Sequence, residues 1–323
     1  MTKRGWLLFA AMAGIWGIPY FLIRVAVDQL QPSVVVFGRT VIAAAILVPL
    51  AARSGALRPA LRRWKPVLAF ALIEMAVPWI LLTTAEQHLA SGLAALIIAS
   101  VPIVGTLVAL ALGDRSVLRV VRIVGIAAGL GGVTLLVGND LSSDQPPPWW
   151  SIAAVLLVCI GYAIAPFIAA HRLADVPSIG VIAVSLAVVS VIYAPIALTA
   201  LPDHSPRVNV VLSVLGLAVI CTGLAFIVFF RLIDEIGPAR AGLITFANPV
   251  VAIALGSVFL DEVITVATVI GFGLVLAGCW LATRPEPGDR AATTAKAAKT
   301  AKTANSERLS TAGSKLVTEP GRG

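Results

Sequence analysis

The chain has 323 residues, of which 59% are hydrophobic and 12% are charged, and its mean hydropathy is +0.98. Soluble globular domains carry about 25% charged residues, so this composition excludes an ordinary soluble protein and predicts one that crosses a membrane many times. The net charge of +8 would suit nucleic-acid binding, but most basic residues lie beside apolar stretches or in the C-terminal segment, so membrane orientation explains it better and no nucleic acid is expected as a partner.

A helical span needs about 20 apolar residues to cross a hydrocarbon core of about 30 Å. Ten stretches of the sequence meet this requirement, so the predicted fold class is an all-α integral membrane protein with ten transmembrane helices. Their approximate bounds are Gly5–Val27, Ser33–Ala52, Lys65–Thr84, Ala90–Gly113, Val120–Gly138, Trp149–Ala170, Pro177–Ala200, Asn209–Phe230, Gly237–Leu260 and Ile264–Thr283.

The basic residues predict the orientation, because cytoplasmic loops retain Lys and Arg. With the N-terminus inside, 21 of the 24 Lys and Arg fall in cytoplasmic segments, and only Arg24, Arg39 and Arg207 do not. We therefore expect a multi-pass protein of the cell membrane with both termini in the cytoplasm. The first stretch is expected to be retained rather than cleaved as a signal peptide. Residues 284–323, rich in Ala, Lys and Thr, are expected to form a disordered cytoplasmic tail.

The first three stretches carry the first candidates for a solute site. Trp16 and Tyr20 share one helix face, either as site residues or as packing or lipid-facing aromatics. Arg39 lies within an apolar run, where a charge costs about 2.5 to 3.5 kcal/mol, which favours a partner or an aqueous cavity, although its shallow position also permits snorkelling to the outer surface. Glu74 lies roughly 13 Å into the third stretch, near the midplane, and Trp79 follows it. Glu74 is expected to bind a cationic group of the solute or a coupling proton, or else to make a structural hydrogen bond or an ion pair with Arg39.

The remaining stretches add fewer candidates. Glu86, at the end of the third stretch, is expected on a solvated turn at the outer surface. Tyr162 in the sixth stretch echoes the aromatics of the first. In the ninth, Thr245 and Asn248 share a face with Pro249, and the proline frees a main-chain carbonyl that needs a partner in a neighbouring helix or a place in a solute cavity.

Two further patterns predict packing rather than chemistry. The run containing Gly125, Gly129, Gly131 and Gly132 predicts a close helix–helix contact. The cysteines, which lie in three different spans, show no metal spacing and no disulfide framework, and neither a metal nor another cofactor is expected.

The chain is predicted to contain two copies of one half. Ala90–Asp114 and Gly237–Asp261 align at an offset of 147 residues, which pairs Pro102 with Pro249. The predicted halves are 1–138 and 149–283, joined by an external linker at 139–148. Each half has five spans, an odd number, so the second half must enter the membrane from the opposite side, and the repeats are predicted to be inverted.

The sequence resembles the EamA-type branch of the drug/metabolite transporter superfamily over Trp6–Thr283. The resemblance is carried by W-G-I-P-Y-F from Trp16, by A-E-Q-H-L-A-S-G-L-A-A-L-I-I-A-S-V-P from Ala85, and by G-P-A-R-A-G-L-I-T-F-A-N-P-V-V-A through F-L-D-E-V-I-T. It implies a ten-helix permease with a central cavity, commonly exporting amino acids, related metabolites or toxic compounds, often with proton or substrate exchange. The family's glutamate after the repeat proline is matched by Glu262, whereas the first half has Asp114 and Arg115.

The function expected is therefore that of a secondary transporter, a permease or exporter, that moves a small metabolite, amino acid or drug-like solute by alternating access. A passive channel and a membrane-embedded enzyme are the alternatives. The short loops offer no set of catalytic residues for an enzyme, and a channel would more naturally show a ring of repeated polar or charged residues lining a pore. The sequence contains no P-loop, which excludes an energising ATPase within this chain. The expected partners are the solute and the lipid bilayer, with a coupling proton and a homodimer left open.

Overall fold

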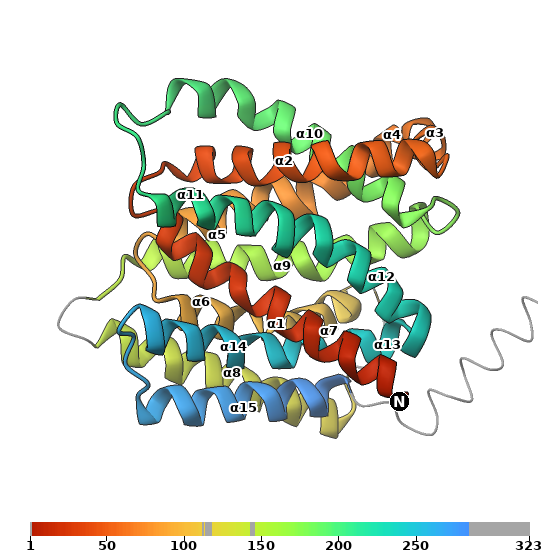
Figure 1. The fold of residues 1–323 in the computed structure, drawn as a ribbon. Helices are drawn as coiled ribbons and strands as arrows, with labels where there is room; N and C mark the ends of the chain where they lie inside the picture. Colours follow the sequence, from red (N-terminus) through yellow and green to blue (C-terminus); the bar gives the residue numbers. More distant parts are fainter. Residues whose placement is uncertain (1, 112, 114–117, 143–145, 284–323) are drawn as a thin grey trace, which may run out of the picture. The chain divides into compact units, whose positions relative to one another are not determined.

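Long apolar runs satisfy all their main-chain polar groups internally only as helices, and the computed structural model is helical accordingly (Figure 1). It describes residues 2–111, Gly113, 118–142 and 146–283, and no strand occurs among them. The elements are α1 (Lys3–Ala26), α2 (Pro32–Arg53), α3 (Leu57–Arg62), α4 (Trp64–Phe70), the π-helix η1 (Ala71–Ala76), α5 (Val77–Ala85), α6 (Ser91–Ile98), α7 (Val101–Ala111), α8 (Val120–Leu141), α9 (Trp149–Arg172), α10 (Ser178–Thr199), α11 (Val208–Leu215), the π-helix η3 (Gly216–Leu224), α12 (Ala225–Ile236), α13 (Pro238–Ala241), α14 (Ile244–Phe259) and α15 (Val266–Thr283).

The helical membrane class is confirmed. Within the described residues, nine helices are long and apolar enough to cross a membrane. They coincide with nine of the predicted stretches. The remaining stretch, Gly237–Leu260, is divided into α13 and α14, and the 16 residues of α14 fall short of a full span. The Asp114–Arg115 pair, part of the linker and the segment 284–323 lie outside the described residues.

The outer surface of the bundle is apolar. Only 28% to 56% of the residues in each span are buried inside the protein. Large apolar side chains therefore face outward, such as Trp149, which is 76% exposed, and Val266, which is 75% exposed. A surface of this kind is stable against lipid and would aggregate in water.

Two spans contain π-helical segments. In the third span, η1 precedes Pro78, whose ring nitrogen has no hydrogen to donate to the preceding turn, and the N–H of Val77 reaches back to the carbonyl of Leu72. Gly161 of α9 lets that helix approach this irregular turn, because a Cβ atom there would stand 2.6 Å from the carbonyl oxygen of Ile73. In the eighth span, η3 replaces two turns of α-helix between α11 and α12. Such bulges commonly mark functional sites.

Glycines set the closest helix contacts. Gly125, Gly129 and Gly132 of α8 face α15, where Gly271 and Gly278 return the contact. The packing role predicted for the glycine run is thus confirmed at these positions. Other close neighbours are α2 with α10, α5 with α9, and α1 with α14 and α12. This arrangement brings α2, η1, α5 and η3 around one buried region.

Candidate functional site

A buried arginine lies where the first and second halves of the chain meet. Arg39 of α2 is 9% exposed, and its Nε donates a hydrogen bond of 2.8 Å to the hydroxyl of Thr222 in η3. Its guanidinium carbon stands 3.8 Å from the centre of the Trp79 ring in α5. A buried cation stacked on an indole and held by one hydroxyl keeps further donors for a ligand. The side chain therefore turns into the bundle and does not snorkel to the surface.

Two tyrosines complete the surroundings of Arg39. Tyr20 of α1 is 8% exposed, and Tyr162 of α9 is partly buried. Both hydroxyls lie within electrostatic range of the Arg39 guanidinium. Tyr162 packs against the apolar cluster that contains Trp79. Four of the predicted site residues thus gather from four different helices, and we name Tyr20, Arg39, Trp79 and Tyr162 the arginine cluster.

Glu74 lies beside this cluster but does not pair with its cation. It is partly buried within η1 and interacts electrostatically with Tyr162 of the cluster. In the described part of the chain no ion pair joins Glu74 to Arg39. Its carboxyl group and the guanidinium are therefore separate polar groups that are not joined in an ion pair.

The other predicted residues lie elsewhere. Trp16 packs against Phe229 and Phe226 of α12, with ring centres 4.7 Å and 6.1 Å apart. Asn248 of α14 has a buried Oδ1 without a hydrogen-bond partner in the described residues, and its main-chain carbonyl faces Gly17 of α1. Thr245 is partly buried one turn earlier. The structure brings these residues to the contact of α1, α12 and α14 rather than to Arg39.

The expectation that Glu86 lies on a solvated turn is wrong. The residue is 0% exposed, and both carboxyl oxygens are buried without a hydrogen-bond partner among the described residues. Nη1 of Arg24 donates to the main-chain carbonyls of Glu86 and Gln87, at 3.2 Å and 3.3 Å. Helical spacing carried a signal that could have located it, because Trp79, Leu82 and Glu86 fall on one face and all three are buried.

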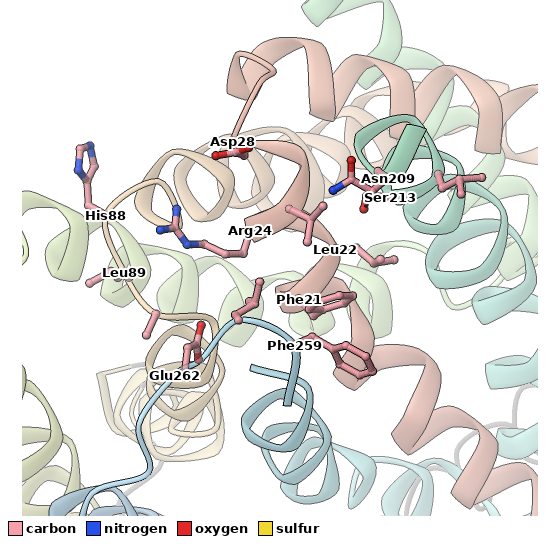
Figure 2. A pocket seen from close by; sticks show the side chains of 14 residues that line it. Phe21, Leu22, Arg24, Asp28, His88, Leu89, Asn209, Ser213, Phe259 and Glu262 are labelled. Atoms are coloured by element: carbon pink, nitrogen blue, oxygen red, sulfur yellow. Dashed lines mark hydrogen bonds between the residues drawn. The ribbon is translucent and has the colours of Figure 1, made fainter. Parts of the chain in front are cut away.

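A cavity of about 760 Å³ opens at the same end of the bundle (Figure 2). It is lined by the end of α1, the turn before α6, the start of α11 and the end of α14, and its charged lining residues include Arg24, Asp28 and Glu262. Asp28 is paired with Arg207 at the rim, where both side chains are exposed. Arg24 and Glu262 thus face the cavity without belonging to that surface ion pair.

Glu262 joins the end of α14 to the start of α6. Its Oε1 accepts a hydrogen bond of 2.7 Å from the N–H of Ser91, and its Oε2 accepts one of 3.0 Å from the N–H of Gly92. The first N–H groups of a helix have no partner within it and attract negative charge. Gly256 makes room for this carboxylate, since a Cβ atom there would collide with it. We call this contact the Glu262 clamp.

The model of the EamA-like transporter family matches the chain twice, over residues 3–138 and 149–284. The chain belongs to the EamA-like transporter family. Membrane transport of a solute is the function that membership indicates, and the protein is accordingly a multi-pass membrane protein.

Relatives agree with this membership. The chain is 30% identical to an uncharacterized inner membrane transporter of Escherichia coli, YedA, with 83% of this chain and 87% of that protein aligned. It is 24% identical to an uncharacterized transporter of Archaeoglobus fulgidus, over 86% of this chain and 98% of the relative. A crystal structure with 19% sequence identity superposes with a TM-score of 0.61 and covers 88% of this chain and 97% of the other, which shows a shared fold.

Within this EamA-like chain, sequence reasoning located the arginine cluster but not its surroundings. Thr222, the hydrogen-bond partner of Arg39, is 0% exposed, and its hydroxyl donates to the main-chain carbonyl of Leu217 at 2.8 Å. A lone threonine in an apolar span carries no signal of this kind.

Proposed function

We propose that this protein is a secondary transporter that moves a small solute by alternating access, built from ten spans in two inverted five-helix repeats. The observation that carries the proposal is Arg39, a buried cation held between spans of the two halves by Trp79 and Thr222. A charge at such a place is costly unless function requires it, and solute sites of secondary transporters lie between inverted repeats.

The helix contacts support the two repeats. In the proposed repeat, α1 corresponds to α9, and α14 corresponds to α6 and α7, so the contact of α1 with α14 has its counterpart in the contact of α9 with α6 and α7. Likewise, α5 corresponds to η3 and α12, so the contact of α5 with α9 has its counterpart in the contact of α1 with η3 and α12. The α2–α10 contact maps onto itself. The two π-helices fall in the third and eighth spans, which also correspond. In this proposal α13 and α14 together supply the short ninth crossing.

Charge separation suggests the solute class. Arg39 presents a guanidinium and Glu74 a carboxyl group, Tyr162 interacts electrostatically with both, and no ion pair joins the two in the described residues. A solute that carries both an anionic and a cationic group, such as an amino acid or a related metabolite, would satisfy both. The guanidinium would hold the carboxylate of the solute, and Glu74 its ammonium group.

Transport in proteoliposomes tests this proposal. Purified protein is reconstituted with an unlabelled amino-acid mixture inside, and uptake of each labelled amino acid is followed. Counterflow that saturates with external solute supports the proposal. Flux that rises linearly with concentration indicates a channel, and chemical conversion of the solute indicates an enzyme.

The orientation has its own test. His204 and Ser54 are exposed residues in loops predicted to lie on opposite sides of the membrane. Single cysteines at these positions, in a background lacking the three buried native cysteines, are treated with an impermeant maleimide on intact cells. Labelling of His204→Cys alone supports a cytoplasmic N-terminus, and labelling of Ser54→Cys alone contradicts it.

A further inference from the structure

Glu86 occupies a position that disfavours a charged side chain. Both of its carboxyl oxygens are buried, and no donor in the described residues reaches either one. An ionised carboxylate without hydrogen bonds in an apolar place is far less stable than a neutral carboxylic acid in the same place. The packing around Glu86 therefore selects the form that has bound a proton.

The neighbours of Glu86 place charges near it without pairing it. The groups that face it are Tyr20 and Arg24 of α1, Arg39 of α2 and Glu262 of the turn after α14, while Cys159 and Tyr162 of α9 face Tyr20. Nη1 of Arg24 donates its hydrogen bonds to main-chain carbonyls rather than to the carboxyl group of Glu86. Burial raises the pKa of Glu86 well above its ordinary value, Glu262 raises it further, and Arg24 and Arg39 offset part of the rise.

The large cavity lies next to residues that surround this carboxyl group. Arg24 and Glu262, two of the charged neighbours of Glu86, also line that space of about 760 Å³ (Figure 2). Leu89, three residues after Glu86, belongs to the lining as well. In our proposal, a proton leaves Glu86 when the Arg24 side chain moves aside, with the O–H bond breaking and the proton passing to a water molecule in the cavity.

We propose that Glu86 is the proton-binding site of this transporter and that its proton controls the Glu262 clamp on α6. The proposal rests on the transport function argued above and separates two roles: Glu74 contacts the solute and Glu86 carries the proton. With Glu86 neutral, the Glu262 carboxylate accepts from Ser91 and Gly92 undisturbed. Loss of the proton places a second negative charge beside Glu262, and like charges in a poorly hydrated region repel strongly.

The clamp is suited to transmit this change. It joins the turn after α14, in the second half, to the first turn of α6, in the first half, so releasing it frees the two halves at this end of the bundle. Arg24 stands near enough to move from the main-chain carbonyls to the ionised carboxylate of Glu86. Deprotonation and opening at the cavity end are coupled in this way.

Infrared difference spectroscopy tests the proton site without any solute. Full-length protein in lipid nanodiscs is titrated from about pH 6 to about pH 9, and the carbonyl stretch of a protonated carboxyl group in an apolar environment is followed. The titration is carried out in a Glu74→Gln background, which removes the acid within the third span. We expect a band that disappears as the pH rises, is lost at every pH when Glu86→Gln is added, and is retained when the control Asp203→Asn is added, which changes an exposed carboxylate. A band that persists after Glu86→Gln is added, or no such band in the Glu74→Gln background, overturns the proposal.

Amide hydrogen exchange tests the link to the clamp. The exchange of Ser91 and Gly92 is measured relative to the first turn of α10, so that the base catalysis common to all amides cancels. The ratio should rise severalfold with pH in the unmodified protein and stay constant in Glu86→Gln. A constant ratio in the unmodified protein shows that the clamp does not respond to Glu86. Absence of solute counterflow would count against the transport proposal alone, since neither measurement here requires a solute.

Discussion

Glu74 lies within the third span and Glu86 directly follows its last residue, Ala85, and the surroundings of the two acids differ in kind. Glu74 sits in a π-helical turn, partly exposed, with the arginine cluster beside it. Glu86 sits at the end of α5, fully enclosed and without a donor among the described residues. The difference teaches that depth along a span and burial within the bundle are separate properties. The more central acid is partly exposed, whereas the more peripheral one is enclosed.

The largest effect is expected from Arg39→Lys, which tests whether transport depends on the guanidinium group near the two acids. Lysine keeps the charge but loses the Nε–H bond to Thr222 and the planar stacking on Trp79. Charge-assisted hydrogen bonds contribute about 1.5 to 3 kcal/mol, so counterflow should fall about tenfold to a hundredfold.

The matched control is Arg63→Lys, in which an exposed arginine paired with Asp175 is changed in the same way. Its counterflow should stay within about twofold of the unmodified protein, because exposed ion pairs contribute little. Equal rates for the two variants at equal membrane abundance would show that the guanidinium of Arg39 has no special role.

The next effect concerns pH. The pKa of Glu86 is raised in the folded protein, so the folded state holds its proton more tightly than the unfolded chain does. The contribution of Glu86 to the free energy of unfolding is therefore greatest at low pH. It falls as the pH rises from the ordinary pKa of glutamate, about 4.3, through the raised pKa of the folded protein. The slope contributed by Glu86 is at most about 1.4 kcal/mol per pH unit within this window.

Thermal unfolding in detergent over a series of pH values measures this slope. Glu86→Gln should flatten the profile in the window, and Asp203→Asn should leave it as in the unmodified protein. An unchanged profile in Glu86→Gln would mean that another group governs the pH dependence, and the contrast between the two acids would lose its basis.

Glu74→Gln should produce a smaller effect and the opposite pattern. The substitution keeps shape and hydrogen bonding but removes the charge that would hold a cationic group of the solute, so counterflow of a zwitterion should fall about fivefold to tenfold. Its pH dependence should remain, because Glu86 supplies it in our proposal. If rate, affinity and pH dependence all stay unchanged, Glu74 is structural.

Composition and periodicity predicted the helical membrane class and nine of the spans, because the cost of leaving main-chain groups unpaired in lipid dominates every local preference. They also identified Arg39, because a charged residue within an apolar stretch is visible in the sequence alone. They misplaced Glu86, because its burial is created by α1, α2 and the turn after α14, which lie far from it in sequence. The Glu262 clamp was beyond prediction for the same reason, since its partners are about 170 residues away.

The smallest effect is expected from Gly161→Ala, which perturbs the surroundings of Glu74 and leaves those of Glu86 alone. A Cβ atom at this position would stand 2.6 Å from the carbonyl oxygen of Ile73 and 3.0 Å from the ring of Pro78, so α9 must move away from η1. Overpacking of this kind costs about 1 to 3 kcal/mol, and the π-helical turn can yield, so we expect about 1 kcal/mol and a fall in melting temperature of a few degrees. Gly131→Ala is the matched control, because it adds the same methyl group to α8 where no atom lies within 4 Å. The informative measurement is the pH profile of unfolding: Gly161→Ala should lower it by a constant amount, because Glu86 and the Glu262 clamp lie at the other end of α5. A profile that changes shape would show that the two acids are coupled through the span, and the separation of solute and proton roles between them would fail.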